Sequence, residues 1–428
     1  MTNGRATTEV ADRLADPLLG KLVGHASVGV EFWDGSKWGP SDPKARIYLR
    51  SKDALRRILW SPGELGAARA FVNGEIDIEG DLIEVLRSMR TGGQNLHSGF
   101  RLLPRILTSA SRLGAVGRPL PPPPEEIVPR GFRHSMARDA QSVRHHYDVG
   151  NEFYRLVLGP SMTYSCAHFT EPTKSLTEAQ ASKCDLVSRK LGLHERPGMR
   201  LLDVGCGWGS MAMHAASKYN ALVVGVTISE EQFKAATRRV ELAGLADRIE
   251  IRLVDYRQLK GERFDAISSI GMSEHVGKAH IGDYFSTLSS LLSPQGRLLN
   301  HAISSVGGSK LGRRSFMNRY VFPDGELLDV GDTVLAMERA GLEVRDVESL
   351  REHYALTLRR WAANLDANWD AAVALVGIGR ARVWRLYMAA SAVGFEDGGL
   401  AIHQVLGTLP SDDGTSGMPF TRDTGVTS

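Results

Sequence analysis

The sequence predicts an α/β protein in which a larger domain built on a parallel sheet follows a smaller N-terminal α+β domain. The first observation is a series of short apolar runs that alternate with helical patterns. These runs are Leu201–Val204, Leu222–Val226, Ile249–Leu253, Ala266–Ser269 and Gly296–His301. Such alternation favours a parallel sheet with helices on both faces. The second observation is the length, because 428 residues exceed one ordinary hydrophobic core.

The N-terminal domain is expected over residues 1–118. Val28–Trp33 and Ala45–Leu49 alternate like strands, with a turn at Gly35 between them. Ser51 suits the cap of a following helix, and a helix through Leu82–Met89 closes the unit.

A proline-rich stretch marks the domain boundary. Residues 119–130 are expected to form a stiff linker, because consecutive prolines favour extended backbone. The larger domain then spans residues 131–410. The tail over residues 411–428 is rich in Gly, Ser, Thr and Asp and is predicted to be disordered.

Composition argues against several protein classes. The sequence has no run of eighteen apolar residues and no apolar stretch after its first residues, so we expect neither a transmembrane helix nor a secretory signal. Three cysteines form neither a disulfide framework nor a metal-ligand spacing, so no metal is expected and a reducing cytoplasm is favoured. A net charge of +3 gives no reason to expect a nucleic acid partner.

The stretch from Arg87 to Arg144 is rich in arginine, poor in acids and interleaved with apolar residues. This pattern is typical of a basic amphipathic helix that lies on an anionic membrane. A solvated, arginine-rich helix between domains has the same pattern, and the sequence leaves both interpretations open.

A glycine-rich turn follows the first strand of the larger domain. Asp203 ends the apolar run, and Gly205, Gly207 and Gly209 precede a helical pattern. Strand, glycine turn and helix together indicate a Rossmann-like nucleotide site, where glycine lets a cofactor approach the backbone. The spacing differs from that of dinucleotide enzymes and resembles motif I of S-adenosylmethionine (SAM) methyltransferases.

Two later strand ends are further candidates for the cofactor site. Thr227 and Gln232 follow the second strand, which lacks the usual acid at its tip, and both can form hydrogen bonds. Asp255 and Tyr256 follow the third strand, where an adenine edge is usually bound. A helix cap at the first place and a simple turn at the second explain the same residues.

An ordered set of motifs makes the sequence more specific. They are His146–Tyr154, Met162–Cys166, Gly271–Gly277, Asn300–Ile303, Tyr320–Gly325 and His353–Thr357. Together with the strand motif Gly225–Gln232, this set resembles the cyclopropane-fatty-acyl-phospholipid synthases and is similar to the mycolic acid cyclopropane synthases. The resemblance covers Arg144 to about Leu406 and extends more weakly to the N-terminal unit.

The resemblance implies a reaction and a set of residues. SAM methylates the cis double bond of a phospholipid acyl chain, and the resulting cation loses a proton from the new methyl group and closes to a cyclopropane. A bound bicarbonate ion is implied as the base. Its implied ligands are Cys166, Glu274, His301, the backbone of Ile303, and Tyr354. Tyr164 and Ser165 are implied to contact SAM.

This assignment agrees with the chemistry. An alkene is a weak nucleophile, so catalysis must come from positioning and electrostatics. A small anion beside a cation in an apolar pocket is strongly stabilising and needs donors such as His301, Tyr354 and the Cys166 thiol. Glu274 is expected to orient His301 or to accept the bicarbonate proton. Water must be excluded, because it would trap the cation as an alcohol.

The implied substrate is a membrane phospholipid with an unsaturated acyl chain, reached at the inner membrane surface by a cytoplasmic, peripherally associated enzyme. Tyr320, Phe322 and Trp361 are candidates for the acyl tunnel, although core packing would explain them equally well. Members of the family often form dimers, but no dimer seam is readable in this sequence.

Two departures from the family pattern leave alternatives open. Ser273 stands where the family often has an aromatic residue, and Ser391 stands where synthases often have a cysteine. A C-methylase that leaves a methylene or methyl branch is the first alternative. The others are a methyltransferase for an oxygenated or free lipid and a non-catalytic membrane lipid-binding protein.

Overall fold

The computed structural model describes residues 28–93, 111, 114–127, 149–309, 312, 314–323 and 325–421. These residues divide between two compact units. The first comprises Met1–Pro129, Gly312–Pro323 and Leu365–Val393, and the second comprises Arg130–Leu311, Asp324–Asn364 and Gly394–Ser428. The sequence predicted contiguous domains instead. It missed the two later segments of the first unit, because tertiary contacts rather than local composition decide their place.

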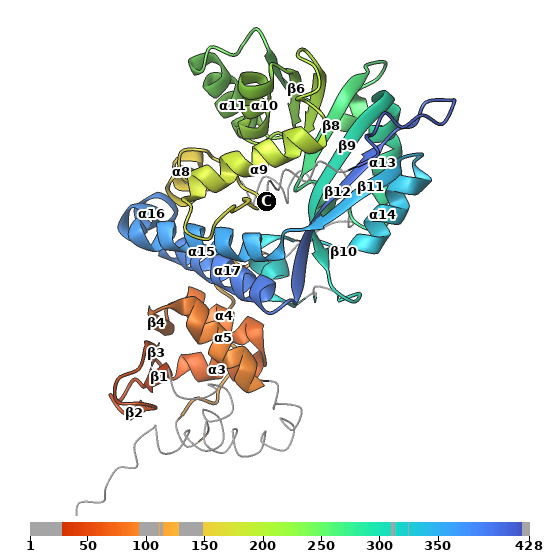
Figure 1. The fold of residues 1–428 in the computed structure, drawn as a ribbon. Coiled ribbons are helices and arrows are strands. Elements are labelled where there is room, and N and C mark those ends of the chain that lie inside the picture. The colour runs from red at the N-terminus through yellow and green to blue at the C-terminus, as the bar shows by residue number, and fades with distance from the viewer. Residues whose placement is uncertain are drawn as a thin grey trace, which may run out of the picture. The chain divides into compact units, whose positions relative to one another are not determined.

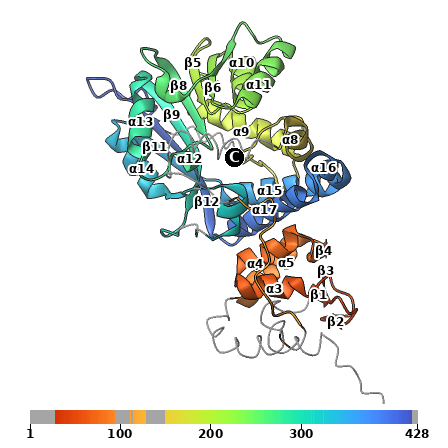
Figure 2. The ribbon, with the colours of Figure 1, turned by 180° about the vertical axis from the view of Figure 1, so that it is seen from behind.

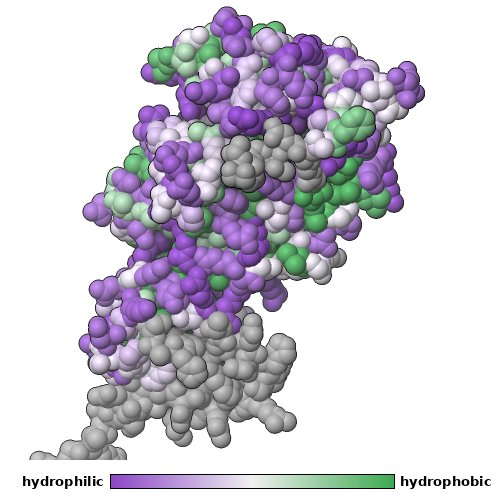
Figure 3. Space-filling model, in the orientation of Figure 1, coloured by the Kyte–Doolittle hydropathy of each residue, from purple (hydrophilic) through white to green (hydrophobic). Residues whose placement is uncertain are grey.

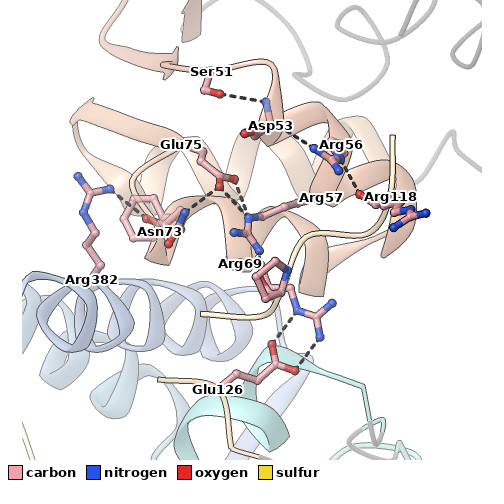
Figure 4. A network of polar contacts seen from close by, with 12 residues as sticks. Ser51, Asp53, Arg56, Arg57, Arg69, Asn73, Glu75, Arg118, Glu126 and Arg382 are labelled. Carbon is pink, nitrogen blue, oxygen red and sulfur yellow. Dashed lines mark hydrogen bonds and ion pairs between the residues drawn. The ribbon is translucent and has the colours of Figure 1, made fainter. Parts of the chain in front are cut away.

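The first unit holds a four-stranded sheet in the order β2-β1-β3-β4. Its elements before the linker are β1 (Val28–Glu31), β2 (Lys37–Trp38), β3 (Ala45–Leu49), α3 (Asp53–Trp60), α4 (Glu64–Val72), β4 (Ile76–Gly80) and α5 (Leu82–Gly93). The turn at Gly35 joins β1 to β2, whereas β1 and β3 run parallel. Ser51 accepts a hydrogen bond from the backbone of Asp53 at 3.0 Å (Figure 4), but the N-cap of α3 is Lys52 and no side chain caps this helix, so the predicted Ser cap is wrong.

The second unit is built on an eight-stranded sheet in the order β11-β12-β9-β8-β5-β6-β7, with β10 paired to β9 (Figure 1). Its strands are β5 (Arg200–Val204), β6 (Leu222–Thr227), β7 (Ile249–Leu253), β8 (Phe264–Ile270), β9 (Leu292–Ser305), β10 (Leu328–Asp329), β11 (Glu343–Ser349) and β12 (Leu400–Thr408). The predicted runs match β5 to β9, which pair in parallel. The α/β fold class is confirmed, and antiparallel β12 and β11 extend the sheet beyond the prediction.

Helices cover both faces of this sheet (Figures 1 and 2). The helices that begin in this unit are α8 (Asn151–Leu158), α9 (Leu176–Lys190), α10 (Ser210–Tyr219), α11 (Glu230–Leu242), α12 (Ser273–Val276), α13 (Ile281–Ser290), α14 (Val330–Arg339) and α15 (Arg351–Ala367). Leu201 and Val223 pack with α9 and α10, whereas Leu202 and Val224 pack with α13 on the opposite face. Adjacent strand residues therefore supply two separate cores, as the period of a β-strand requires. Two further helices, α16 (Trp369–Val376) and α17 (Ile378–Glu396), follow α15.

Residues 411–421 of the C-terminal tail, which the sequence predicts to be disordered, contact the rest of the second unit, and residues 422–428 lie outside the described residues. The Thr408 hydroxyl donates to the Ser416 carbonyl at 2.9 Å, and Arg297 donates to the Gly417 carbonyl at 3.2 Å. Met418 packs against the core between the sheet and α9. Gly414 and Gly417 have positive φ, which lets the segment turn back toward the sheet.

No helix of the described residues is long and apolar enough to cross a bilayer. The face drawn in Figure 3 is largely hydrophilic, and its hydrophobic residues lie in scattered groups. Most of the stretch from Arg87 to Arg144 lies outside the described residues, as do residues 128–130 of the linker.

Candidate active site

A cavity of about 250 Å³ lies in the second unit, where β5, β6, β7 and β8 end. Ligands of open α/β sheets bind at this carboxyl edge. Of the residues that the sequence assigned to the cofactor, those that line the cavity are Tyr164, Ser165, Asp203, Gly205, Gly207, Thr227, Gln232, Asp255 and Tyr256. Gly209 does not line it and instead begins α10 with a φ of 78°.

Gly205 is required by the shape of the turn. Its φ is 70°, and a Cβ at this position would lie 2.3 Å from the Met272 sulfur. Any larger residue would therefore strain the backbone and push a neighbouring side chain that also lines the cavity.

Asp203 brings a carboxylate to the cavity. It is 2% exposed, and one of its oxygens accepts a hydrogen bond from the Ser268 hydroxyl at 2.7 Å. Burial raises the pKa of its carboxyl to about 6. The other oxygen is buried without a hydrogen-bond partner among the described residues, so it remains available to a ligand.

At the ends of β6 and β7, the residues that line the cavity also form local hydrogen bonds. Thr227 donates a hydrogen bond to Gln232 at 2.8 Å, while Ser229 provides the side-chain cap of α11. Asp255 accepts from the Arg257 backbone at 2.9 Å and caps a short 3₁₀ turn. At both strand ends, the residues predicted for the cofactor site therefore line the cavity, and a helix cap or turn is present at the same place.

A second set of predicted residues lies buried beside β9. Glu274 accepts a hydrogen bond from the Ile303 backbone at 2.8 Å. The Gln404 side-chain nitrogen lies 3.1 Å from His301 Nδ1, and these two residues are direct cross-strand partners. With the amide in this orientation its nitrogen donates to Nδ1, and the proton of the neutral imidazole is then on Nε2.

Cys166 and Tyr354 meet at the same backbone position. The Cys166 sulfur lies 3.2 Å from the Ala167 carbonyl and 3.7 Å from the Leu350 carbonyl. The Tyr354 backbone donates to the Leu350 carbonyl at 3.1 Å. Leu350 in turn donates to Ile402, which pairs with Ile303 across the sheet. A short series of hydrogen bonds and strand pairs thus connects the catalytic residues predicted from the sequence.

Burial sets the charge state of these groups. It raises the pKa of Glu274 to about 7, although the hydrogen bond from Ile303 opposes this shift. It also raises the pKa of the Cys166 thiol and, together with the Lys183 and Lys190 charges, lowers the pKa of His301 well below its ordinary value. At neutral pH, His301 and Cys166 are uncharged, and Glu274 is close to its titration point.

Two atoms of the predicted catalytic residues, Glu274 Oε2 and His301 Nε2, are buried without a hydrogen-bond partner among the described residues, as is Gln404 Oε1 beside His301. Glu274 Oε2 is an acceptor or a protonated hydroxyl, and His301 Nε2 is a donor. A small oxyanion that both donates and accepts hydrogen bonds fits this pair. The Ile303 N–H, in contrast, already donates to Glu274.

The predicted acyl-chain residues belong to different units. Tyr320 and Phe322 lie in the first unit, where Tyr320 donates to Glu126 at 3.2 Å and Phe322 packs edge-on against Tyr387. Trp361 lies in the second unit and is fully buried. Its ring packs against those of Tyr164 and Tyr354, and so connects the cavity wall to the buried cluster.

Sequence reasoning missed Lys183, a fully buried residue of α9 that lines the cavity and donates to the Ser165 hydroxyl at 3.1 Å. It also missed Gln404, which orients His301. A usable signal for Lys183 existed, because it lies between Gln180 and Val187 on the buried stripe of the helix.

The sheet order, the glycine turn after β5 and the cavity at the strand ends define a SAM-dependent methyltransferase. A family model described as mycolic acid cyclopropane synthetase matches residues 134–405. A probable fatty acid methyltransferase of Mycobacterium tuberculosis is 42% identical over 399 residues, which cover 91% of this chain and 92% of the relative. The cyclopropane-fatty-acyl-phospholipid synthase of Escherichia coli is 32% identical, with 85% of this chain and 87% of the relative covered.

A solved structure of mycolic acid cyclopropane synthase CmaA1, complexed with SAH and CTAB, has a TM-score of 0.59 and 35% identity. It covers 63% of this chain and 97% of its own. The chain therefore belongs to the mycolic acid cyclopropane synthetase family of SAM-dependent enzymes.

Proposed function

We propose that this enzyme converts the cis double bond of a phospholipid acyl chain into a cyclopropane ring, with bicarbonate as the base. The observation that carries the proposal is the buried pair of Glu274 Oε2 and His301 Nε2, an acceptor and a donor without partners among the described residues. Burying polar atoms in this state costs free energy unless a ligand binds them.

When bound, SAM supplies the methyl group. The residues that would hold SAM are those that line the cavity, with Asp203 offering a free carboxylate oxygen. Those that would hold bicarbonate are Cys166, Glu274, His301, Ile303 and Tyr354, among which Glu274 and His301 have open atoms.

The chain's own residues perform three tasks in this mechanism. His301, held by Gln404, presents its Nε2 proton to an oxyanion. Glu274, whose pKa is about 7, takes up the proton that leaves the new methyl group by way of that oxyanion. The buried rings of Trp361 and Tyr354 keep water from the substrate cation.

The test combines the purified enzyme, SAM and vesicles of a cis-unsaturated phospholipid, and examines the lipid by proton NMR. Upfield cyclopropane signals that weaken without bicarbonate and vanish in Glu274→Gln support the proposal. Glu241→Gln, on the exposed surface of α11, serves as the matched control and should keep full activity. Absence of any lipid product despite SAM binding would contradict it.

A methylene- or methyl-forming C-methylase is the second candidate. It is favoured by the name of the 42% identical relative, a fatty acid methyltransferase, and by Ser273, a small buried residue beside Glu274. Vinylidene or branched-methyl signals in the same spectra would identify this reaction. We further propose that the enzyme works on the cytoplasmic surface of the membrane, and vesicle co-sedimentation tests this part.

A further inference from the structure

A second cavity, of about 340 Å³, lies within the first unit. Four arginines line it together with Trp60, namely Arg57, Arg69, Arg314 and Arg319. The four positive charges around this cavity repel one another unless anions lie close to them.

Two of these arginines are neutralised by buried acids, as Figure 4 shows. Arg57 Nε lies 2.7 Å and 2.9 Å from the two carboxylate oxygens of Glu75. Arg69 forms a two-pronged pair with Glu126, at 2.7 Å for each contact. These ion pairs hold the side chains of the cavity wall in place. The net positive charge of the cavity therefore comes from Arg314 and Arg319.

Arg314 and Arg319 form no ion pair with any described residue. Arg319 Nε is, in addition, buried without a hydrogen-bond partner among those residues. Among the described residues, no acid therefore pairs with the charges of Arg314 and Arg319, and Arg319 Nε has no acceptor.

Guanidinium groups bind phosphate oxygens in a two-pronged geometry. Trp60 is 56% exposed, although its indole N–H donates to the Gly117 carbonyl at 2.7 Å. A tethered, exposed tryptophan beside basic groups is typical of a membrane–water interface. We propose that this cavity binds the phosphate group of a phospholipid, a proposal that rests on the phospholipid substrate proposed above.

A phosphate ester free in solution has the same chemistry, so the test uses both sources. The full-length enzyme is titrated calorimetrically with inorganic phosphate and, separately, co-sedimented with phosphatidylcholine vesicles that contain phosphatidylglycerol. The double variant Arg314→Gln/Arg319→Gln should lower vesicle partitioning by about tenfold to thirtyfold, since each basic residue near an anionic surface raises partitioning by roughly threefold to fivefold. It should also abolish phosphate binding.

Lys44→Gln/Arg50→Gln is the matched control, because it removes the same charge from exposed positions of the same unit outside the cavity. An equal loss of both kinds of binding in the control overturns the proposal, as does unchanged binding in the cavity variant. Loss of phosphate binding with normal vesicle partitioning overturns the lipid as the source. None of these measurements needs turnover, so failure of the proposed reaction would be seen separately by NMR.

A different observation, in the second unit, concerns Lys183. Its side chain is 1% exposed, yet it forms no ion pair with a described acid; it donates to the Ser165 hydroxyl and contacts the Cys184 thiol. Burial raises the pKa of the Asp203 carboxyl, which lines the same cavity, and the Lys183 charge opposes this shift, but no carboxylate of the described residues pairs with Lys183 directly. A buried ammonium without a directly paired carboxylate is costly. It lines the cofactor cavity, where the ligand carries its own carboxylate.

We infer that Lys183 is the positioning residue for the carboxylate of the methionine part of SAM, both by its charge and by holding Ser165. The test compares two ligands, S-adenosylhomocysteine and 5′-methylthioadenosine, which lacks the amino-acid part. Lys183→Met should weaken binding of the first by about tenfold to a hundredfold, the range expected for one charge-assisted contact, and leave the second unchanged.

Lys190→Met, on the same helix, is the control, because its ammonium pairs with Asp346 at 2.9 Å. It should weaken neither ligand. Lys183→Gln removes the charge but keeps a donor for Ser165, so weaker binding in this variant reflects the lost charge and not misfolding. Equal weakening of both ligands, or of neither, in the two Lys183 variants overturns the inference.

Discussion

Substitution of Glu274 by glutamine should stabilise the protein at alkaline pH while it removes activity. The carboxyl is buried, and its pKa rises from an ordinary value of 4.5 to about 7. At 1.36 kcal/mol for each pH unit, this shift corresponds to about 3 kcal/mol of destabilisation once the group must ionise in the folded protein.

The pH range follows from the sign of the shift. Below pH 4.5 the carboxyl is neutral in both the folded and the unfolded chain, so its ionisation does not affect the free energy of unfolding. Between about pH 4.5 and 7 the unfolded chain ionises first, and the wild type loses stability relative to the variant. Above pH 7 the difference is complete. Glutamine keeps an acceptor for the Ile303 backbone and carries no charge.

Urea denaturation at pH 5 and pH 8 measures this difference directly. Glu274→Gln should match the wild type to within about 1 kcal/mol at pH 5 and exceed it by about 3 kcal/mol at pH 8. Its rate of product formation should fall at least about a hundredfold, the usual contribution of an acid–base group. A pH-independent difference in stability would refute the assigned burial, and an active variant would refute the assigned role.

Burial and backbone geometry set three further expected outcomes. Gly205→Ala should abolish S-adenosylhomocysteine binding in a calorimetric titration, because the new Cβ would lie 2.3 Å from a neighbouring sulfur; retained affinity would contradict that contact. Trp361→Ala should reduce the free energy of unfolding by about 3–5 kcal/mol, and a loss below about 1 kcal/mol in urea would argue against its packing role. The three cysteines are buried with raised thiol pKa values, so Ellman's reagent at pH 8 should label them only after unfolding; rapid labelling of the folded protein would show that a thiol is accessible.

The parts of the fold that the sequence predicted are those whose signal is local. The strand from Leu201 to Val204 and the turn at Gly205 could be predicted because an apolar run followed by glycines has few alternative structures. β11 was missed because its residues Glu343–Ser349 are mostly polar and largely half-buried at the sheet edge. The segment Leu365–Val393 could not be assigned to the first unit, since only tertiary contacts determine that.

The same distinction applies to the candidate site. The motifs around Glu274 and His301 were visible because several characteristic residues stand together. Lys183 and Gln404 stand alone within a helix and a strand, and their importance appears only when burial and hydrogen bonds are known. Isolated buried polar residues are the part of a site that local pattern identifies least well.

Three residues of the second unit that are predicted to be catalytic or to bind the cofactor have a buried polar atom without a hydrogen-bond partner among the described residues. Asp203 lines the cofactor cavity, while Glu274 and His301 belong to the buried cluster. Each of them lowers the stability of the ligand-free protein. Ligands that bind the folded state should therefore stabilise it strongly, by about 2.7 kcal/mol at a concentration one hundred times the Kd. If the stabilisations by S-adenosylhomocysteine and bicarbonate are additive, the cavity and the buried cluster are independent sites; a larger combined effect would mean that the shared contact through Trp361 couples them.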